Sequence, residues 1–151
     1  MDAVPPKPGY LISVFGNRCP RCRRGHIYSS GNPYDLSNTV KMKQECPVCG
    51  QPTEIEVGFY YGTGYVSYAL SVAFTIFSFL LWWLIIGFSL DDKRFFWWIG
   101  VNSFLLIALQ PPLMRISRTL WLSWFVKYDP NWPTNKIETP ERLNKDQGNN
   151  W

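Results

Sequence analysis

Hydrophobic and polar residues are segregated along the chain rather than evenly mixed. Residues 57–90 form a run of 34 positions without a charged side chain, and residues 95–114 form a second run of 20. A bilayer hydrocarbon core about 30 Å thick requires roughly 20 apolar residues of helix. The runs predict transmembrane helices at 62–90 and 95–112, joined by an external loop at 91–94. The alternative, two buried helices of a soluble core, would require a very small domain to enclose both on every side.

The segments that flank the two runs predict different structures. Pro111 and Pro112 are expected to end or kink the second helix. The next segment, 113–128, has apolar and basic positions on different sides of a helix, which predicts an amphipathic helix at the inner interface or against the rest of the protein. Residues 129–151 predict an extended polar tail that is disordered alone. Residues 1–18 form an N-terminal segment without a signal-peptide pattern, so the first span is expected to direct insertion.

Basic residues are distributed unevenly around the apolar runs. Seven lysines and arginines precede the first run and six follow the second, whereas the loop between them carries two basic and two acidic residues. Positive charges are retained on the cytoplasmic side of a membrane. We therefore expect both termini in the cytoplasm, and the formal net charge of +4 is mostly explained by this topology.

Four cysteines form two C-x-x-C motifs separated by 23 residues: Cys19 with Cys22, and Cys46 with Cys49. Two such turns together can supply the four corners of a zinc–thiolate tetrahedron. The motifs "CPRCRRG" and "CPVCG" share a proline after the first cysteine and a glycine shortly after the second, which favours similar turns.

Two segments on either side of the second motif's turn, 39–46 and 52–59, alternate apolar with charged residues, as half-buried strands do. They predict an antiparallel hairpin, with lysines on one strand opposite glutamates on the other. We therefore expect residues 19–57 to form a β-rich zinc ribbon.

Zinc is the favoured occupant of the cysteine site. A domain of fewer than about 60 residues with few large apolar side chains does not close its own core, whereas zinc contributes roughly 10 to 16 kcal/mol in small zinc domains. Disulfides require an oxidising compartment, and the predicted topology places these thiols in the reducing cytoplasm. We expect one structural Zn²⁺ per chain; the alternatives are a disulfide or redox dithiol and a Cu(I) or labile thiol site.

Small and hydroxyl-bearing residues recur every three or four positions along the first predicted span. These residues are Gly64, Ser67, Ser71, Thr75 and Ser78. Such a face lets two helices approach closely, so we expect it to pack against the second span or another subunit. The alternative is that the hydroxyls bond to carbonyls of their own helix.

Six arginines lie close to the predicted cytoplasmic face of the membrane. They are Arg18, Arg21, Arg23, Arg24, Arg115 and Arg118. A basic residue near an anionic leaflet contributes about 1 kcal/mol of attraction. We expect these side chains to contact an anionic surface or an acidic protein partner, and nucleic acid is the less favoured alternative.

Little in the sequence points to catalysis or transport. The chain has one histidine, and its serine and carboxylate side chains form no convergent motif. Transporters normally carry ionisable residues within the membrane, and the predicted spans carry none. We therefore expect neither an enzyme nor a small-molecule substrate.

The stretches "NPYDL", "KMKQECPVCG" and especially "GFYYGTGYVSYALSV" resemble the bacterial membrane family called domain of unknown function 983, in the form common among Bacteroidetes. The resemblance covers about residues 19–98. It departs at Thr63-Gly64, where relatives are expected to carry Ala-Met, and the second span and tail match only in character. The resemblance implies a small inner-membrane protein with a zinc-ribbon-like head. It carries no established activity, although relatives encoded near cytochrome oxidase genes suggest a link to haem-copper oxidases.

These observations favour a non-catalytic accessory, scaffold or assembly subunit of a bacterial inner-membrane complex, and the resemblance suggests a respiratory, haem-copper oxidase-related one. Its partners are expected to be other inner-membrane proteins and the lipid bilayer. A membrane-anchored Cu(I) or thiol-redox chaperone is the alternative, and a membrane-tethered nucleic-acid-binding ribbon is the third hypothesis.

Overall fold

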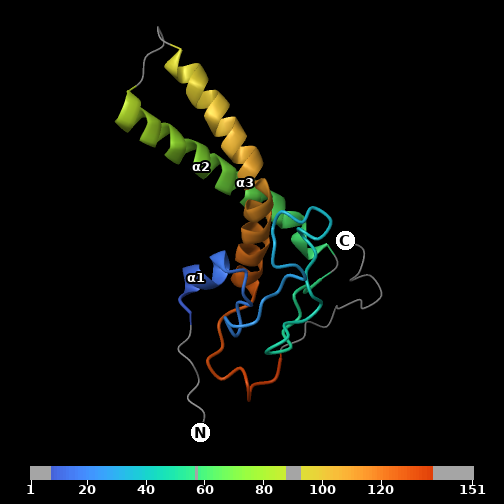
Figure 1. The fold of residues 1–151 in the computed structure, drawn as a ribbon. Helices are drawn as coiled ribbons and strands as arrows, with labels where there is room; N and C mark the ends of the chain where they lie inside the picture. The colour runs from blue at the N-terminus through green and yellow to red at the C-terminus, as the bar shows by residue number, and fades with distance from the viewer. Residues whose placement is uncertain (1–7, 57, 88–92, 138–151) are drawn as a thin grey trace.

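The computed structural model describes residues 8–56, 58–87 and 93–137. In chain order the helices are α1 (Tyr10–Phe15), the 3-10 helix η1 (Phe59–Gly62), α2 (Thr63–Ile86) and α3 (Arg94–Phe125). Figure 1 shows α2 and α3 crossing, with the other described segments gathered around the C-terminal half of α3. We call the described residues of 8–58 and 126–137 the head.

Helices α2 and α3 are both long and apolar enough to cross a membrane. The 24 residues of α2 and the 32 residues of α3 extend about 36 Å and about 48 Å at a rise of about 1.5 Å per residue. In the most apolar 18-residue window, none of α2 and 11% of α3 is buried. Core helices of a soluble protein are mostly buried, whereas these two windows are mostly exposed.

The first predicted span, 62–90, contains the whole of α2. The helix stops at Gly87, whose φ of 82° is readily adopted only by glycine. Residues 88–92, which include most of the predicted external loop, lie outside the described residues.

Pro111 and Pro112 lie inside α3. The predicted division into a span at 95–112 and a separate helix at 113–128 is therefore wrong, because one helix continues through both prolines. A proline lacks the N–H that would bond the carbonyl four residues earlier, so two helical bonds are missing here. Figure 1 shows α3 changing direction near its middle, and the C-terminal half turns toward the head.

The described residues of the head include no β-strand, so the predicted β-rich ribbon is not found. Isolated antiparallel bridges are present instead: Arg18 with His26, Tyr28 with Met42, and Glu45 with Pro52. Prolines lie in or beside both cysteine turns, at positions 20, 47 and 52. Because proline lacks an N–H donor, it limits how far a ladder of backbone hydrogen bonds can extend from each bridge.

The predicted antiparallel pairing of 39–46 with 52–59 is present only next to the second cysteine turn, where Glu45 and Pro52 form a bridge and the Thr53 N–H donates to the Gln44 carbonyl at 3.0 Å. Farther from the turn, residues 40–43 lie against 27–29, with the Lys43 N–H donating to the Ile27 carbonyl at 2.8 Å. The alternating pattern therefore identified the neighbour close to the turn but not the contact of 40–43 with 27–29. The oppositely charged side chains do not decide the pairing because exposed cross-strand pairs contribute only about 0.2 to 1 kcal/mol.

The head and the end of α3 share one hydrophobic core. It contains Cys19, Cys22, Ile27, Tyr28, Cys46, Leu122 and Val126. Ile27 and Leu122 are both fully enclosed, at 0% exposure. The C-terminal turns of α3 are therefore an internal element of the head, and the predicted interfacial helix packs on the head rather than lying free among lipid headgroups.

Two short segments add to this packing. Helix α1, in the predicted N-terminal segment 1–18, packs on α3, where the hydroxyls of Tyr10 and Ser123 lie 2.9 Å apart. At the other end, Trp132 packs against the core and the Asp129 N–H donates to the Arg21 carbonyl at 3.1 Å. Residues 129–137 of the predicted polar tail thus belong to the head, and 138–151 lie outside the described residues.

Candidate metal centre

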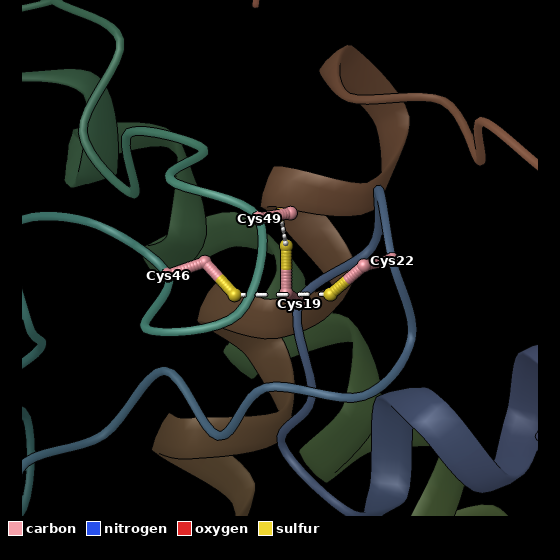
Figure 2. Close-up of side chains that lie close together, drawn as sticks. All are labelled: Cys19, Cys22, Cys46 and Cys49. Atoms are coloured by element: carbon pink, nitrogen blue, oxygen red, sulfur yellow. Dashed lines mark hydrogen bonds between the residues drawn. The ribbon is translucent and has the colours of Figure 1, made fainter. Parts of the chain in front are cut away.

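The four cysteines predicted as metal ligands meet in one cluster. Cys19, Cys22 and Cys46 are buried, with at most 2% exposure, and Cys49 is half-buried. Their sulfur atoms all lie within 4.8 Å of one another. Figure 2 shows the sulfurs converging, with Cys19 facing Cys49 and Cys22 facing Cys46 at Sγ–Sγ distances of 3.7 Å. Each close pair joins one motif to the other.

These distances fit four thiolates around one ion. A tetrahedral site with Zn–S bonds of about 2.3 Å has S–S edges of about 3.8 Å. A disulfide bond is about 2.05 Å long, and all four cysteines are free. The cluster is therefore compatible with a bound metal ion, and a tetrahedral thiolate set is a donor group suited to soft or borderline metals.

The thiols also share their protons unequally. Hydrogen bonding, first from Cys19, lowers the pKa of the Cys22 thiol well below its usual range, because the donors stabilise a thiolate. Hydrogen bonds to Cys22 and the other thiols, together with burial, raise the pKa of Cys19. The cluster therefore favours partial deprotonation by itself, whereas complete deprotonation requires a compensating cation such as a metal ion.

Both cysteine turns have the same backbone construction. The N–H four residues after the first cysteine returns to that cysteine's carbonyl, from Arg23 to Cys19 at 2.7 Å and from Gly50 to Cys46 at 2.9 Å. Both donor residues have positive φ, 57° at Arg23 and 68° at Gly50. The sequence predicted matching turns, but it did not reveal that an arginine takes the left-handed position in the first one.

Gly25 fulfils a different requirement in the first turn. A Cβ at this position would lie 2.4 Å from the Cys46 sulfur, far inside van der Waals contact. Its carbonyl also accepts from the Cys19 N–H at 2.8 Å. Gly25 is thus needed for the close approach of the two motifs, a long-range cause that its place in "CPRCRRG" did not indicate.

Arg115, predicted to contact an anionic surface or partner, instead lies inside the protein at 2% exposure. Its guanidinium donates to backbone carbonyls of the 30–39 loop: Thr39 at 2.8 Å, Ser30 at 2.9 Å and Asn32 at 2.8 Å. The prediction is wrong because a loop without regular structure leaves carbonyls unpaired, and a buried guanidinium with five donors satisfies several at once.

Tyr28 completes the contact between Arg115 and the head. Its ring centroid lies 4.8 Å from the Arg115 Cζ, and its hydroxyl donates to the Arg115 carbonyl at 2.9 Å. Burial raises the pKa of Tyr28 to about 12, because the charged phenolate is disfavoured away from water. The aromatic ring and the arginine together fasten the 30–39 loop to α3.

Arg21 is the second arginine for which the surface prediction is wrong, since it is 5% exposed. It donates to Asp129 at 3.4 Å and to the carbonyl of Asn135 at 2.8 Å. A residue between the first two cysteines thereby holds the chain that follows α3. This partner lies more than 100 positions away, so local sequence gave no signal for it.

The other four predicted arginines are half-buried, with Arg18, Arg23 and Arg24 on the head and Arg118 on α3. Arg23 stacks near Tyr128 at 4.4 Å. Arg118 donates to the Val40 carbonyl at 3.0 Å and lies 4.9 Å from the Tyr60 ring. The structure therefore divides the six arginines into two that are internal and four that keep part of their surface accessible.

The residues of the predicted packing face of α2 have three different environments. Ser78 donates to Asn102 of α3 at 2.7 Å, a direct polar link between the helices. Ser71 and Thr75 donate to carbonyls four residues earlier in their own helix, at 3.0 Å and 2.9 Å. Gly64, Ser67 and Ser71 line a cavity of about 410 Å³ between α2 and α3. The face thus packs closely at one end and opens at the other.

Comparisons of the chain with the models of known protein families, with curated proteins and with solved structures give no match.

Proposed function

We propose that this protein is a non-catalytic accessory or assembly subunit of a bacterial inner-membrane complex, with a structural zinc ion in a cytoplasmic head and both termini in the cytoplasm. The head docks on a cytoplasmic surface and the exposed helix faces dock on membrane-embedded partners. The resemblance to the domain of unknown function 983 family supports this assignment and suggests a respiratory, haem-copper oxidase-related complex.

The location of the thiol cluster carries the proposal. Cys19, Cys22 and Cys46 belong to the same buried core as Leu122 and Val126, at the end of α3. A metal ion held there fixes the head to the membrane helix. Zinc with four protein thiolates has no open coordination position and serves structure rather than catalysis.

The apolar surface of the long helices is the second support. Trp83, Leu84 and Ile85 near the end of α2 are 58%, 82% and 76% exposed. Two helices that cover so little of each other's surface present wide faces to lipid and to neighbouring membrane proteins. Small and hydroxyl-bearing residues, such as those along one face of α2, commonly mediate the association of helices in a bilayer.

Metal and thiol measurements on the full chain, purified from native membranes in mild detergent, test the structural role of the site. We expect one tightly held zinc per chain and slow alkylation of the cysteines until a chelator removes the metal. Copper in place of zinc, or rapid alkylation of the metal-bound protein, would contradict a structural role and favour the chaperone alternative.

Copurification from the same membranes tests the accessory role. We expect the wild-type chain to migrate with a larger membrane complex, and Cys46→Ser to lose that association. Gly31→Ala is the control, because a Cβ added at Gly31 meets no atom within 4 Å. Recovery of the wild-type protein as a lone monomer in every preparation contradicts the proposal.

A further inference from the structure

The cavity between α2 and α3 lies where the two helices separate. Its lining includes Thr63, Gly64, Ser67 and Ser71 of α2, and Gln110 and Arg118 of α3. Pro111 and Pro112 directly follow the lining residue Gln110 in α3, and Figure 1 shows α3 turning toward the head near its middle. The volume of about 410 Å³ is within the range of small-ligand pockets. The opening therefore lies where α2 and α3 diverge on the head side of their crossing, at about the level of the change in direction of α3.

The position along the helices places this cavity at the level of lipid headgroups. About 20 helical residues cross the hydrocarbon core, and counting from the loop ends of α2 and α3 brings the head-side boundary to about Ser67 and Met114. The cavity lining extends to both sides of these residues. This argument depends on α2 and α3 spanning a bilayer and does not depend on the accessory role.

The chemistry of the lining is that of an anion site. Arg118 is its positive charge, and the described lining includes no acidic side chain. A guanidinium carries five N–H donors, and the bond from Arg118 to Val40 uses one of them. Charged donors and planar guanidinium groups bind phosphate oxygens well.

Two neutral side chains in the lining add unsatisfied polar groups. Within the described part of the chain, the side chains of Ser67 and Gln110 have no hydrogen-bond partner, whereas Ser71 is bonded to its own helix. Leaving such groups unpaired near hydrocarbon is unfavourable. A ligand with several acceptor oxygens at this depth satisfies both groups and Arg118 together.

We propose that this cavity binds the phosphodiester headgroup of an anionic membrane phospholipid, with Arg118 contacting the phosphate and Ser67 and Gln110 donating to its oxygens. The acyl chains lie along the exposed apolar surfaces of α2 and α3. A lipid held in this way fixes the height of the head above the membrane, because its headgroup lies between the span of α2 and the head-anchoring half of α3.

Native mass spectrometry of the full chain, released from nanodiscs of phosphatidylglycerol mixed with phosphatidylcholine, tests the site. We expect a retained phosphatidylglycerol molecule. Gly64→Leu should remove it, because a Cβ at Gly64 meets nothing within 4 Å and the side chain can fill the cavity. Gly100→Leu is the matched control: an added Cβ there also meets nothing within 4 Å, and Gly100 lies outside the lining. Equal loss in both variants, or retention in both, overturns the proposal.

Arg118→Gln tests the charge. Loss of a charge-assisted hydrogen bond should lower retention of phosphatidylglycerol roughly tenfold and remove its preference over phosphatidylcholine. Unchanged zinc content in this variant shows that the head is intact; if zinc is lost, Gln110→Leu replaces it, with several-fold weaker retention expected. Inorganic phosphate added at millimolar concentration should not displace the lipid. Displacement by phosphate, or equal retention of both lipids by the wild type, contradicts a lipid headgroup site.

Discussion

The head and the long helices differ in how they use burial. The shared core has seven buried residues, of which three are cysteines, and it is surrounded by side chains that bond to backbone carbonyls. In α2, by contrast, Thr63 and Val66 are the buried residues among the 24 of the helix. Apart from the bonds missing at the two prolines of α3, the helices satisfy their backbone groups internally and expose apolar side chains, which a bilayer accepts. The head has little regular secondary structure to satisfy its backbone groups, so it depends on specific hydrogen bonds and packing contacts between residues far apart in the sequence.

This comparison teaches that the two regions should respond differently to substitution. A single substitution in the head removes a side chain that several backbone carbonyls share as a hydrogen-bond donor, and it leaves buried polar atoms unpaired. Single changes between the helices remove one weak contact from an otherwise complete helix. The following predictions rank these effects from the largest to the smallest.

The largest effect is expected from Cys46→Ser. Loss of one thiolate should release the metal and with it about 10 kcal/mol or more of head stability. Metal analysis and limited proteolysis should show an empty, cleavable head, while circular dichroism retains the signal of α2 and α3. A protease-resistant head in the metal-free variant would contradict the contrast between the two regions.

Arg115→Met should have the next largest effect. It leaves the carbonyls of Ser30 and Thr39 without a donor and removes the closest donor to the Asn32 carbonyl, at a cost of about 3 kcal/mol because acceptors lose their partners. Hydrogen exchange should accelerate through residues 28–42. Lys127→Met, at an exposed position, is the control and should leave exchange unchanged; equal effects would deny Arg115 its anchoring role.

Gly25→Ala tests the close approach of the two cysteine motifs. The added methyl group would lie 2.4 Å from the Cys46 sulfur, and we expect a loss of about 1 to 3 kcal/mol from overpacking together with weaker metal retention. Competition with a chelator measures the retention. Gly31→Ala, with open space around the new Cβ, should behave like the wild type.

Alkaline pH should weaken the head through Tyr28. Its pKa is raised to about 12 in the folded protein from about 10 in an unfolded chain, so its stabilising contribution is complete below about pH 10 and is lost as the pH rises through 12. By pH 11 the loss is about 1 kcal/mol. Stability of the head measured between pH 8 and 11 should fall more steeply for the wild type than for Tyr28→Phe. Parallel curves would contradict a buried, neutral phenol.

The smallest effect is expected from Ser78→Ala. It removes the hydrogen bond to Asn102, and interhelical hydrogen bonds in membranes contribute about 0.6 kcal/mol on average. Unfolding in mixed micelles should show a shift close to this value. Ser103→Ala, on an exposed position of α3, is the matched control; a large shift at Ser78 would mean that the helices resemble the head after all.

The sequence by itself determined the features that depend on local pattern. The two uncharged runs placed both long helices because length and hydropathy are properties of a continuous segment. The spacing of Cys19, Cys22, Cys46 and Cys49 indicated a four-thiol site, because the C-x-x-C turn is a local structure whose geometry hardly varies. Both features are found within the described residues.

The tertiary structure alone decided which positions those features bring together. Burial of Arg21 and Arg115, the need for a glycine at 25 and the neighbour of segment 40–43 all depend on partners far away in the sequence. The continuation of α3 through two prolines has the same cause, since packing of its last turns on the head outweighs the lost backbone bonds. Local conformational propensity and surface charge contribute little to the folding free energy, and long-range packing outweighs them.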